Sequence, residues 1–85
     1  MDLQISERFR EEYHDLPPKL QALVSRKLRY PAESLRHRSL RVKRVQGTTD
    51  LYEASVNMRH RIIFRIVPGA YRLLRIGTHG VFNEL

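Results

Sequence analysis

A glutamate, an arginine and a histidine in the second half of the chain could together carry out phosphodiester chemistry. Side chains alternate between the two faces of a β-strand, and this alternation predicts that Glu53, Arg61 and His79 share one face of a sheet. Cleaving RNA without a metal needs a base for the 2′-hydroxyl, an acid for the leaving 5′-oxygen, and cations for the charge that develops on phosphorus. Histidine transfers protons near neutral pH, and arginine binds phosphate through two N–H groups. The three side chains match these needs, with Glu53 as the best candidate for the base.

Further cations are predicted on the same face, where they would bind an RNA backbone. They are Arg41, Lys43, Arg65 and Arg75. The first two are expected there if no bulge interrupts their strand. The same alternation leaves Ile63 and Leu73 on the solvent side and Arg72 on the core side, which conflicts with their polarity.

Each of these side chains also has a plainer interpretation. A single histidine near a strand end is more often a surface or hydrogen-bonded residue, and arginines on a solvated strand face often serve only solubility and edge protection. Glu53 could pair with Arg61 across two strands, which is worth roughly a few tenths of a kcal/mol. The other histidines, His14, His37 and His60, have no metal-ligand spacing, and four scattered glycines form no phosphate loop. We therefore expect neither a metal nor a cofactor.

The positive charge of the chain is concentrated in its second part. Residues 1–35 hold six Lys/Arg and six Asp/Glu, whereas residues 36–85 hold ten and three, which accounts for the whole net charge of +7. Thirteen of the sixteen cations are arginine, whose planar fork suits phosphate. A polyanion is the predicted partner, with nucleic acid as the commonest one. Binding to an acidic protein, or solubility alone, is the alternative.

The length and composition limit the class of protein. Eighty-five residues predict a single domain, residues 1–85. The chain has no cysteine, so we expect no disulfide and no thiolate metal site, as in a reducing compartment. No apolar run approaches the ~20 residues that span a bilayer. The mixed N-terminus does not have the pattern of a signal peptide. These features predict a cytoplasmic protein without a membrane partner.

The first part of the chain has helical periodicity. Leu3 and Ile5 could form a short strand, after which Ser6 has the features of a helix N-cap. Apolar residues then recur at helical spacing, first at Phe9, Tyr13 and Leu16 and then at Leu20, Leu23, Val24 and Leu28. Pro17-Pro18 separates the two runs, since proline ends one helix and suits the first turn of the next. The pattern predicts a helical hairpin.

The second part has strand periodicity. Strands are predicted at residues 40–43, 51–56, 60–67 and 71–78, joined by short links that include the turn sequence Pro68-Gly69. Short links between successive strands predict an antiparallel meander. The predicted fold class is α+β, with an N-terminal helical hairpin packed on one face of a small antiparallel β-sheet and the other face open.

Four segments of the chain, residues 39–47, 51–54, 61–64 and 76–79, resemble the RelE/ParE superfamily of toxins from type II toxin–antitoxin systems. The two amphipathic helices look similar as well, so the resemblance covers nearly the whole chain. It implies the fold just predicted. The RelE-like branch, with YafQ and YoeB, comprises endoribonucleases that cleave messenger RNA in the ribosomal A site. The ParE-like branch inhibits DNA gyrase and has no catalytic activity.

The resemblance also implies roles for individual residues. Arg61 looks like the arginine that stabilises the scissile phosphate, and His79 resembles the YafQ-like catalytic histidine, a general acid. Phe82 is similar to an aromatic residue that helps to position the substrate. Lys43 falls near the position of a catalytic glutamate in YoeB-like members. Glu53 and Ser55 fall where RelE carries two catalytic lysines; a glutamate there is also found in members that are not nucleases.

Three functions compete on this basis. The favoured one is a metal-independent endoribonuclease toxin that cleaves messenger RNA on the ribosome and inhibits translation. The alternatives are a ParE-like, non-catalytic inhibitor of DNA gyrase and a non-toxic RNA-binding domain of the same fold. For a toxin, the resemblance implies a cognate antitoxin protein as partner, besides the ribosome and messenger RNA.

Overall fold

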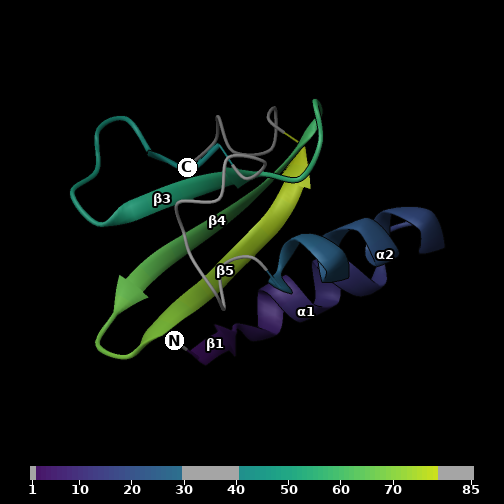
Figure 1. Cartoon of the computed structure of the whole chain (residues 1–85), viewed down its shortest axis with the longest axis horizontal. Helices are drawn as coiled ribbons and strands as arrows, with labels where there is room; N and C mark the ends of the chain where they lie inside the picture. Colours follow the sequence, from purple (N-terminus) through teal and green to yellow (C-terminus); the bar gives the residue numbers. More distant parts are fainter. Residues whose placement is uncertain (1, 30–40, 79–85) are drawn as a thin grey trace.

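Two helices and five strands make up the described part of the chain, residues 2–29 and 41–78 of a computed structural model (Figure 1). In chain order they are β1 (Asp2–Ile5), α1 (Glu7–His14), α2 (Pro18–Lys27), β2 (Lys43–Arg44), β3 (Leu51–Ser55), β4 (His60–Val67) and β5 (Ala70–Thr78). The strands form one sheet in the order β1-β5-β4-β3-β2. The predicted α+β fold is therefore confirmed.

The helical hairpin is fixed by side chains at its ends. Ser6 caps α1, because its Oγ accepts a hydrogen bond from the backbone N–H of Phe9 at 3.0 Å. At the other end, the Gln21 side-chain amide of α2 donates to the carbonyls of Tyr13, His14 and Leu16, at 3.1 to 3.2 Å. The carbonyls of Tyr13 and His14 belong to the last turn of α1 and that of Leu16 to the link after it, where carbonyls lack the i+4 N–H of a continuing helix. One side chain of α2 thus fixes the turn between the helices.

The sheet is mostly antiparallel, as predicted, but its first strand is not. β1 pairs with β5 in parallel, whereas every pairing among β2, β3, β4 and β5 is antiparallel. The helical hairpin between β1 and the rest of the sheet supplies the long connection that a parallel pairing needs. Within the β4–β5 hairpin, Gly69 has φ 75°, as the predicted turn at Pro68-Gly69 requires.

The second strand is shorter than predicted. β2 contains only Lys43 and Arg44, opposite Glu53 and Tyr52, and Leu40 lies outside the described residues. Arg41 has a left-handed backbone with φ 47°, which is incompatible with a strand. The prediction that Arg41 lies in the same strand as Lys43 and on the same face of the sheet is therefore wrong. Arg41 lies beyond the end of β2.

A β-bulge in β5 corrects the predicted faces of that strand. Phe64 of β4 lies opposite Leu73, whereas its neighbour Ile63 lies opposite Arg75, so Leu74 is an extra residue. The extra residue reverses the alternation. Leu73 is consequently buried in the core, and Arg72 is exposed on the other face; both were predicted the other way round.

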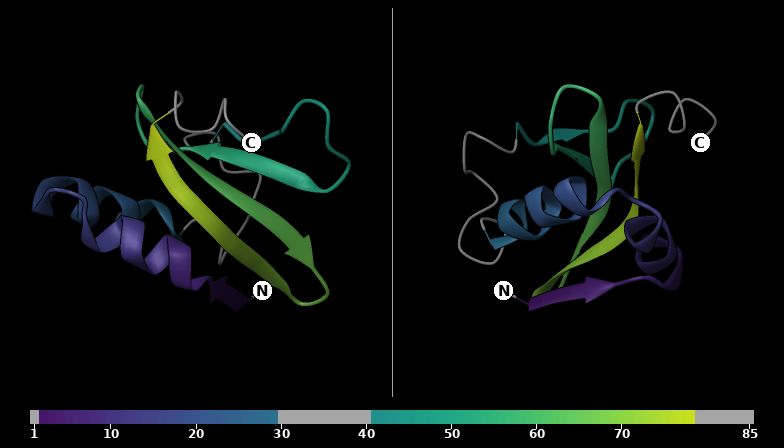
Figure 2. Two further views of the ribbon diagram at one scale, coloured as in Figure 1. Left: turned by 180° about the vertical axis from the view of Figure 1, so that it is seen from behind. Right: turned by 90° about the vertical axis from the view of Figure 1, so that its right-hand side faces the viewer.

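The core lies between the helices and one face of the sheet. Phe9 of α1 and Val24 of α2 join a cluster of buried sheet residues, among them Ala54, Val56, Ile62, Phe64, Tyr71, Leu73 and Ile76. Figure 1 and the left view of Figure 2 show the two helices side by side, next to β5. Among residues 2–29 and 41–78, neither helix has the length and apolar character to cross a membrane.

Helix α1 also covers the edge of β5 that β1 leaves unpaired. β1 pairs only with residues 70–73, which leaves later backbone groups of β5 without a strand partner on that side. Ser6 Oγ donates to the carbonyl of Leu74 at 2.8 Å, and Glu12 Oε1 accepts from the N–H of Ile76 at 3.1 Å. The side chains of Ser6, the N-cap of α1, and of Glu12 within α1 thus take the place of a neighbouring strand and protect the edge of β5.

Candidate functional site

The face of the sheet opposite the core carries most of the predicted site residues, and we call it the charged face. Residues that lie opposite one another on paired strands share a face, so the register defines its rows. The first row is Ser55, Arg61 and Gly77, the second is Lys43, Glu53, Ile63 and Arg75, and the third is Leu51, Arg65, Arg72 and Gln4. The structure therefore brings together five of the eight predicted site residues, which are Lys43, Glu53, Arg61, Arg65 and Arg75.

Arg61 lies at the start of β4, and two backbone oxygens accept hydrogen bonds from its side chain. Its Nη1 donates to the carbonyl of Asn57 at 2.6 Å and to that of His60 at 3.0 Å. The turn itself is fixed by Asn57, whose Oδ1 accepts from the N–H groups of Arg59 and His60 at 2.9 and 2.8 Å. No carboxylate of residues 2–29 or 41–78 forms an ion pair with Arg61. The guanidinium is positioned without being neutralised.

Glu53 lies in the middle of the charged face, and it is the buried acidic residue of the described chain, 8% exposed. Its Oε1 is 3.3 Å from Nζ of Lys43 on β2. It lies opposite Ile63, not Arg61, so the cross-strand pair of Glu53 with Arg61 does not form. Ile63 is itself only 2% exposed, so this row of the charged face is partly covered and less open than predicted.

Arg75 has a partner that the sequence did not indicate. Its Nη2 donates to Oε2 of Glu12 at 2.8 Å, and the two side chains are only 14% and 23% exposed. Because the same carboxylate accepts from the N–H of Ile76, it joins α1 to β5 through both of its oxygens. Glu12 gave no signal as a site residue because it is one of several charges on the polar side of a short helix.

Arg65 is paired less tightly. Its Nε lies 3.0 Å from Oδ2 of Asp50, which precedes β3, and both side chains are substantially exposed, 42% and 57%. The buried Nε nevertheless forms no hydrogen bond within the described part of the chain, so the contact is an ion pair without hydrogen-bond alignment. Asp50 was not predicted either, because it falls in a turn sequence whose composition already explains it.

Of the remaining three predicted site residues, the structure describes only Arg41. His79 and Phe82 lie outside the described residues, and Arg41 is exposed beyond the end of β2. In the described ranges, no group of three or more His, Cys, Asp or Glu could hold a metal ion.

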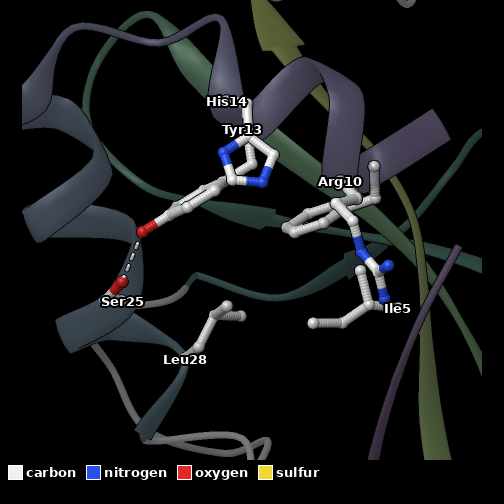
Figure 3. Close-up of a pocket in the computed structure, with 7 residues that line it drawn as sticks. Ile5, Arg10, Tyr13, His14, Ser25 and Leu28 are labelled. Atoms are coloured by element: carbon white, nitrogen blue, oxygen red, sulfur yellow. Dashed lines mark hydrogen bonds between the residues drawn. The ribbon is translucent and has the colours of Figure 1, made fainter. Parts of the chain in front are cut away.

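A separate cavity lies between the two helices and β1. It has a volume of about 310 Å³ and is lined by Ile5, Phe9, Arg10, Tyr13, His14, Ser25 and Leu28. Figure 3 shows Ile5, Tyr13 and Leu28 around this space, with the Tyr13 hydroxyl 2.7 Å from Oγ of Ser25. None of the predicted site residues lines it, so the cavity and the charged face are distinct features.

The chain is similar in structure to toxins of toxin–antitoxin systems. YafQ from Escherichia coli strain BL21(DE3) matches with a TM-score of 0.79 and 13% identity over 95% of this chain and 96% of that chain. A chain of the toxin–antitoxin complex RelBE2 from Mycobacterium tuberculosis matches with a TM-score of 0.74 and 20% identity, over 92% and 96%. A chain of the archaeal RelE–RelB complex from Pyrococcus horikoshii OT3 matches with a TM-score of 0.72 and 18% identity, over 93% and 94%.

No protein-family model and no curated protein sequence matches the chain. At these identities the structural similarity establishes the fold, and it agrees with the superfamily that the sequence resembles. The chain therefore has the fold of the RelE and YafQ toxins. What it does with that fold has to be argued from its own residues.

Proposed function

We propose that this chain is the toxin of a type II toxin–antitoxin system and that it is a metal-independent endoribonuclease that cleaves messenger RNA on the ribosome. The observation that carries the proposal is the state of Arg61. Its guanidinium is fixed by two backbone carbonyls and has no carboxylate partner in the described chain, so its full charge is available to a phosphate. The fold, which is that of YafQ, is consistent with the proposal. The sequence resemblance separately implies that this arginine stabilises the scissile phosphate.

The proposed reaction is a transesterification followed by release of the 5′-hydroxyl product. A base removes the proton of the 2′-hydroxyl, whose oxygen then attacks phosphorus while the bond to the 5′-oxygen breaks. Arg61 donates to the non-bridging oxygens, where negative charge develops, and His79 gives its proton to the leaving 5′-oxygen. The products are a 2′,3′-cyclic phosphate and a free 5′-hydroxyl. Every step uses nitrogen and oxygen groups of this chain and its substrate.

Glu53 is the proposed base. It is the diagonal neighbour of Arg61 on the adjacent strand, since it lies opposite Ile63, two residues along β4. Its carboxylate is mostly buried, and Lys43 is 3.3 Å away. For this role the Lys43 ammonium group has to move away so that the 2′-hydroxyl can reach the carboxylate. The side chain of Lys43 is 69% exposed, which leaves room for this movement.

Primer extension on messenger RNA in a translation reaction tests the proposal. Cuts at fixed codon positions are expected with the wild-type protein, and Arg61→Ala and His79→Ala should each abolish them. Arg8→Ala is the matched control, because Arg8 is an exposed arginine of helix α1 and is not one of the sheet residues that form the charged face. Intact messenger RNA with the wild-type protein, or full cleavage by His79→Ala, would refute the mechanism.

We propose a cognate antitoxin as the protein partner and the cytoplasm, where ribosomes and messenger RNA are found, as the place of action. Solved complexes of RelE-type proteins contain antitoxins, among them RelB, and the net charge of +7 favours an acidic partner. A pull-down with the product of the adjacent gene tests this. Absence of binding by an acidic neighbour would count against the antitoxin.

A gyrase inhibitor without catalysis is the second candidate, and the Glu53–Lys43 pair favours it. The position where the resemblance places catalytic lysines of RelE holds a buried carboxylate that an exposed lysine neutralises. Glu53→Gln separates the two functions. An endoribonuclease with Glu53 as base should lose activity by about 10²–10⁴-fold. A gyrase inhibitor should leave messenger RNA intact and stop DNA supercoiling both as the wild-type protein and as Glu53→Gln.

A further inference from the structure

The bulge in β5 brings two arginines directly opposite one another on the charged face. Arg65 of β4 pairs in register with Arg72 of β5, and Gln4 of β1 lies beside Arg72 in the same row. Like charges at directly opposite positions of a sheet repel each other. The repulsion between these two arginines destabilises the row, and an anion bound between them would relieve it.

The structure compensates this charge only in part. Asp50 lies 3.0 Å from Nε of Arg65, but that nitrogen forms no hydrogen bond within the described residues, and both side chains are substantially exposed. Arg72 is exposed and forms no ion pair with any carboxylate of residues 2–29 or 41–78. One carboxylate, poorly aligned, thus faces two guanidinium groups.

The position of the pair relative to Arg61 is fixed by the strand. Arg61 and Arg65 lie on the same face of β4 and are four residues apart, which corresponds to ~13 Å at the strand rise of about 3.3 Å per residue. At the ~3.4 Å axial rise of stacked nucleotides, this distance corresponds to about four nucleotides, and an extended strand needs fewer.

We propose that Arg65 and Arg72 form a second phosphate site, which binds the backbone of the same RNA strand a few nucleotides away from the phosphate at Arg61. This inference rests on the proposed function, since it gives the direction of the RNA along β4. In the free protein Asp50 occupies the place of the phosphate next to Arg65, and RNA displaces it. A nucleic-acid backbone fits better than an acidic peptide, because its anions recur at a regular spacing along one line.

The salt dependence of RNA binding tests this inference. The probe is a 2′-O-methyl oligoribonucleotide, which lacks the attacking hydroxyl and is longer than β4, and its affinity is measured by fluorescence anisotropy over a range of KCl concentrations. Each phosphate contact to a single strand contributes about 0.7 to the slope of log K against log salt. Arg72→Gln should therefore reduce the slope by about 0.7, and Arg8→Gln, the control on α1, should leave it unchanged.

A second variant changes the affinity in the opposite direction. Asp50→Asn removes the carboxylate that competes with phosphate at Arg65, so it should tighten binding of the same probe, and Arg72→Gln should cancel part of that gain. Equal slopes for Arg72→Gln and Arg8→Gln would overturn the inference, as would a wild-type protein that does not bind the probe. The inference would also be overturned if Arg72→Gln lowered the affinity for poly-glutamate as much as it lowers the affinity for the RNA probe, because the site would then attract any polyanion.

These outcomes are separate from those of the proposed function. Primer extension reports cleavage by Arg61 and His79, whereas the binding slope reports the pair at the other end of β4. Cleavage by the wild-type protein together with an unchanged slope for Arg72→Gln would leave the endoribonuclease intact and remove the second site.

Discussion

Arg61 and Arg75 lie on the same face of one sheet, in adjacent rows, and their surroundings are opposite in kind. Arg75 is 14% exposed and donates to a carboxylate of α1 that also accepts from the backbone of β5. Nη1 of Arg61 donates to two carbonyls of the adjacent turn, and no carboxylate of residues 2–29 or 41–78 forms an ion pair with this arginine. The charge of Arg75 is thus compensated by a carboxylate of the fold, whereas no described carboxylate compensates the charge of Arg61.

The difference shows that position on a face does not by itself make a cation functional. A guanidinium that already pairs with a half-buried carboxylate has its charge largely compensated, and removing it leaves that carboxylate without its counter-ion. A guanidinium held by neutral carbonyls is oriented and still positive. Exchange of each arginine should therefore affect a different property of the protein.

The largest effect is expected from Arg61→Ala on activity. Loss of one group that stabilises charge in the transition state costs about 10²–10³-fold in rate. Stability should change little, because the arginine gives up only two hydrogen bonds to carbonyls at the surface of a turn. Primer extension measures the first quantity and urea unfolding the second. A strongly destabilised Arg61→Ala protein would remove the distinction from Arg75.

Arg75→Ala should have the reverse profile, with a large effect on stability. The half-buried hydrogen bond to Glu12 joins two charged groups, and loss of such a bond costs about 1.5–3 kcal/mol. Urea unfolding measures this loss. Arg72→Ala is the matched control, because Arg72 is an exposed arginine of the same strand without an ion pair in the described chain and faces another arginine, so its removal should not destabilise the protein. Equal stability of the two variants would contradict the structural role of Arg75.

The sequence predicted the elements well, and it predicted the faces of β5 correctly after the bulge but not before it, for a physical reason. Alternation is a local rule, so it holds along β4, where Arg61 and Ile62 fall on the faces expected of them. A bulge adds a residue because of what lies beside the strand, and here Ser6 Oγ binds the carbonyl of the extra residue, Leu74. That contact joins residues 68 positions apart, and no window of sequence contains both.

The same limit explains which parts of the site were missed. Lys43 and Glu53 were both predicted on the charged face, since short-range alternation assigns each of them. Their pairing, and the burial of Glu53, depends on the register of β2, which begins only after the left-handed Arg41. Glu12 was missed because its role depends on how far β1 extends along β5.

An intermediate effect on stability is expected from Glu12→Gln, which separates the hydrogen bond of this side chain to Ile76 from its hydrogen bond to Arg75. The amide oxygen of glutamine can still accept from the N–H of Ile76, whereas the NH2 group that replaces Oε2 cannot accept from Arg75. The hydrogen bond to Arg75 is therefore lost, but no carboxylate is left without its counter-ion, as it is in Arg75→Ala. The loss of stability should be about 1 kcal/mol, smaller than that of Arg75→Ala. Urea unfolding of the two variants side by side gives the comparison. A Glu12→Gln loss as large as that of Arg75→Ala would mean that the negative charge itself holds α1 against β5.

The smallest effect on stability is expected from Lys43→Ala. Lys43 is 69% exposed, and ion pairs with an exposed partner contribute about 0–1 kcal/mol, even though Glu53 on the other side is buried. The pair should also weaken with added salt, because solvent reaches the lysine, whereas the Glu12–Arg75 pair should be much less sensitive. Urea unfolding at low and high KCl measures both. A loss for Lys43→Ala that exceeds the loss for Glu12→Gln would show that burial of one partner decides the strength of an ion pair on this face, and Lys43 would then belong with Arg75 among the cations bound into the fold.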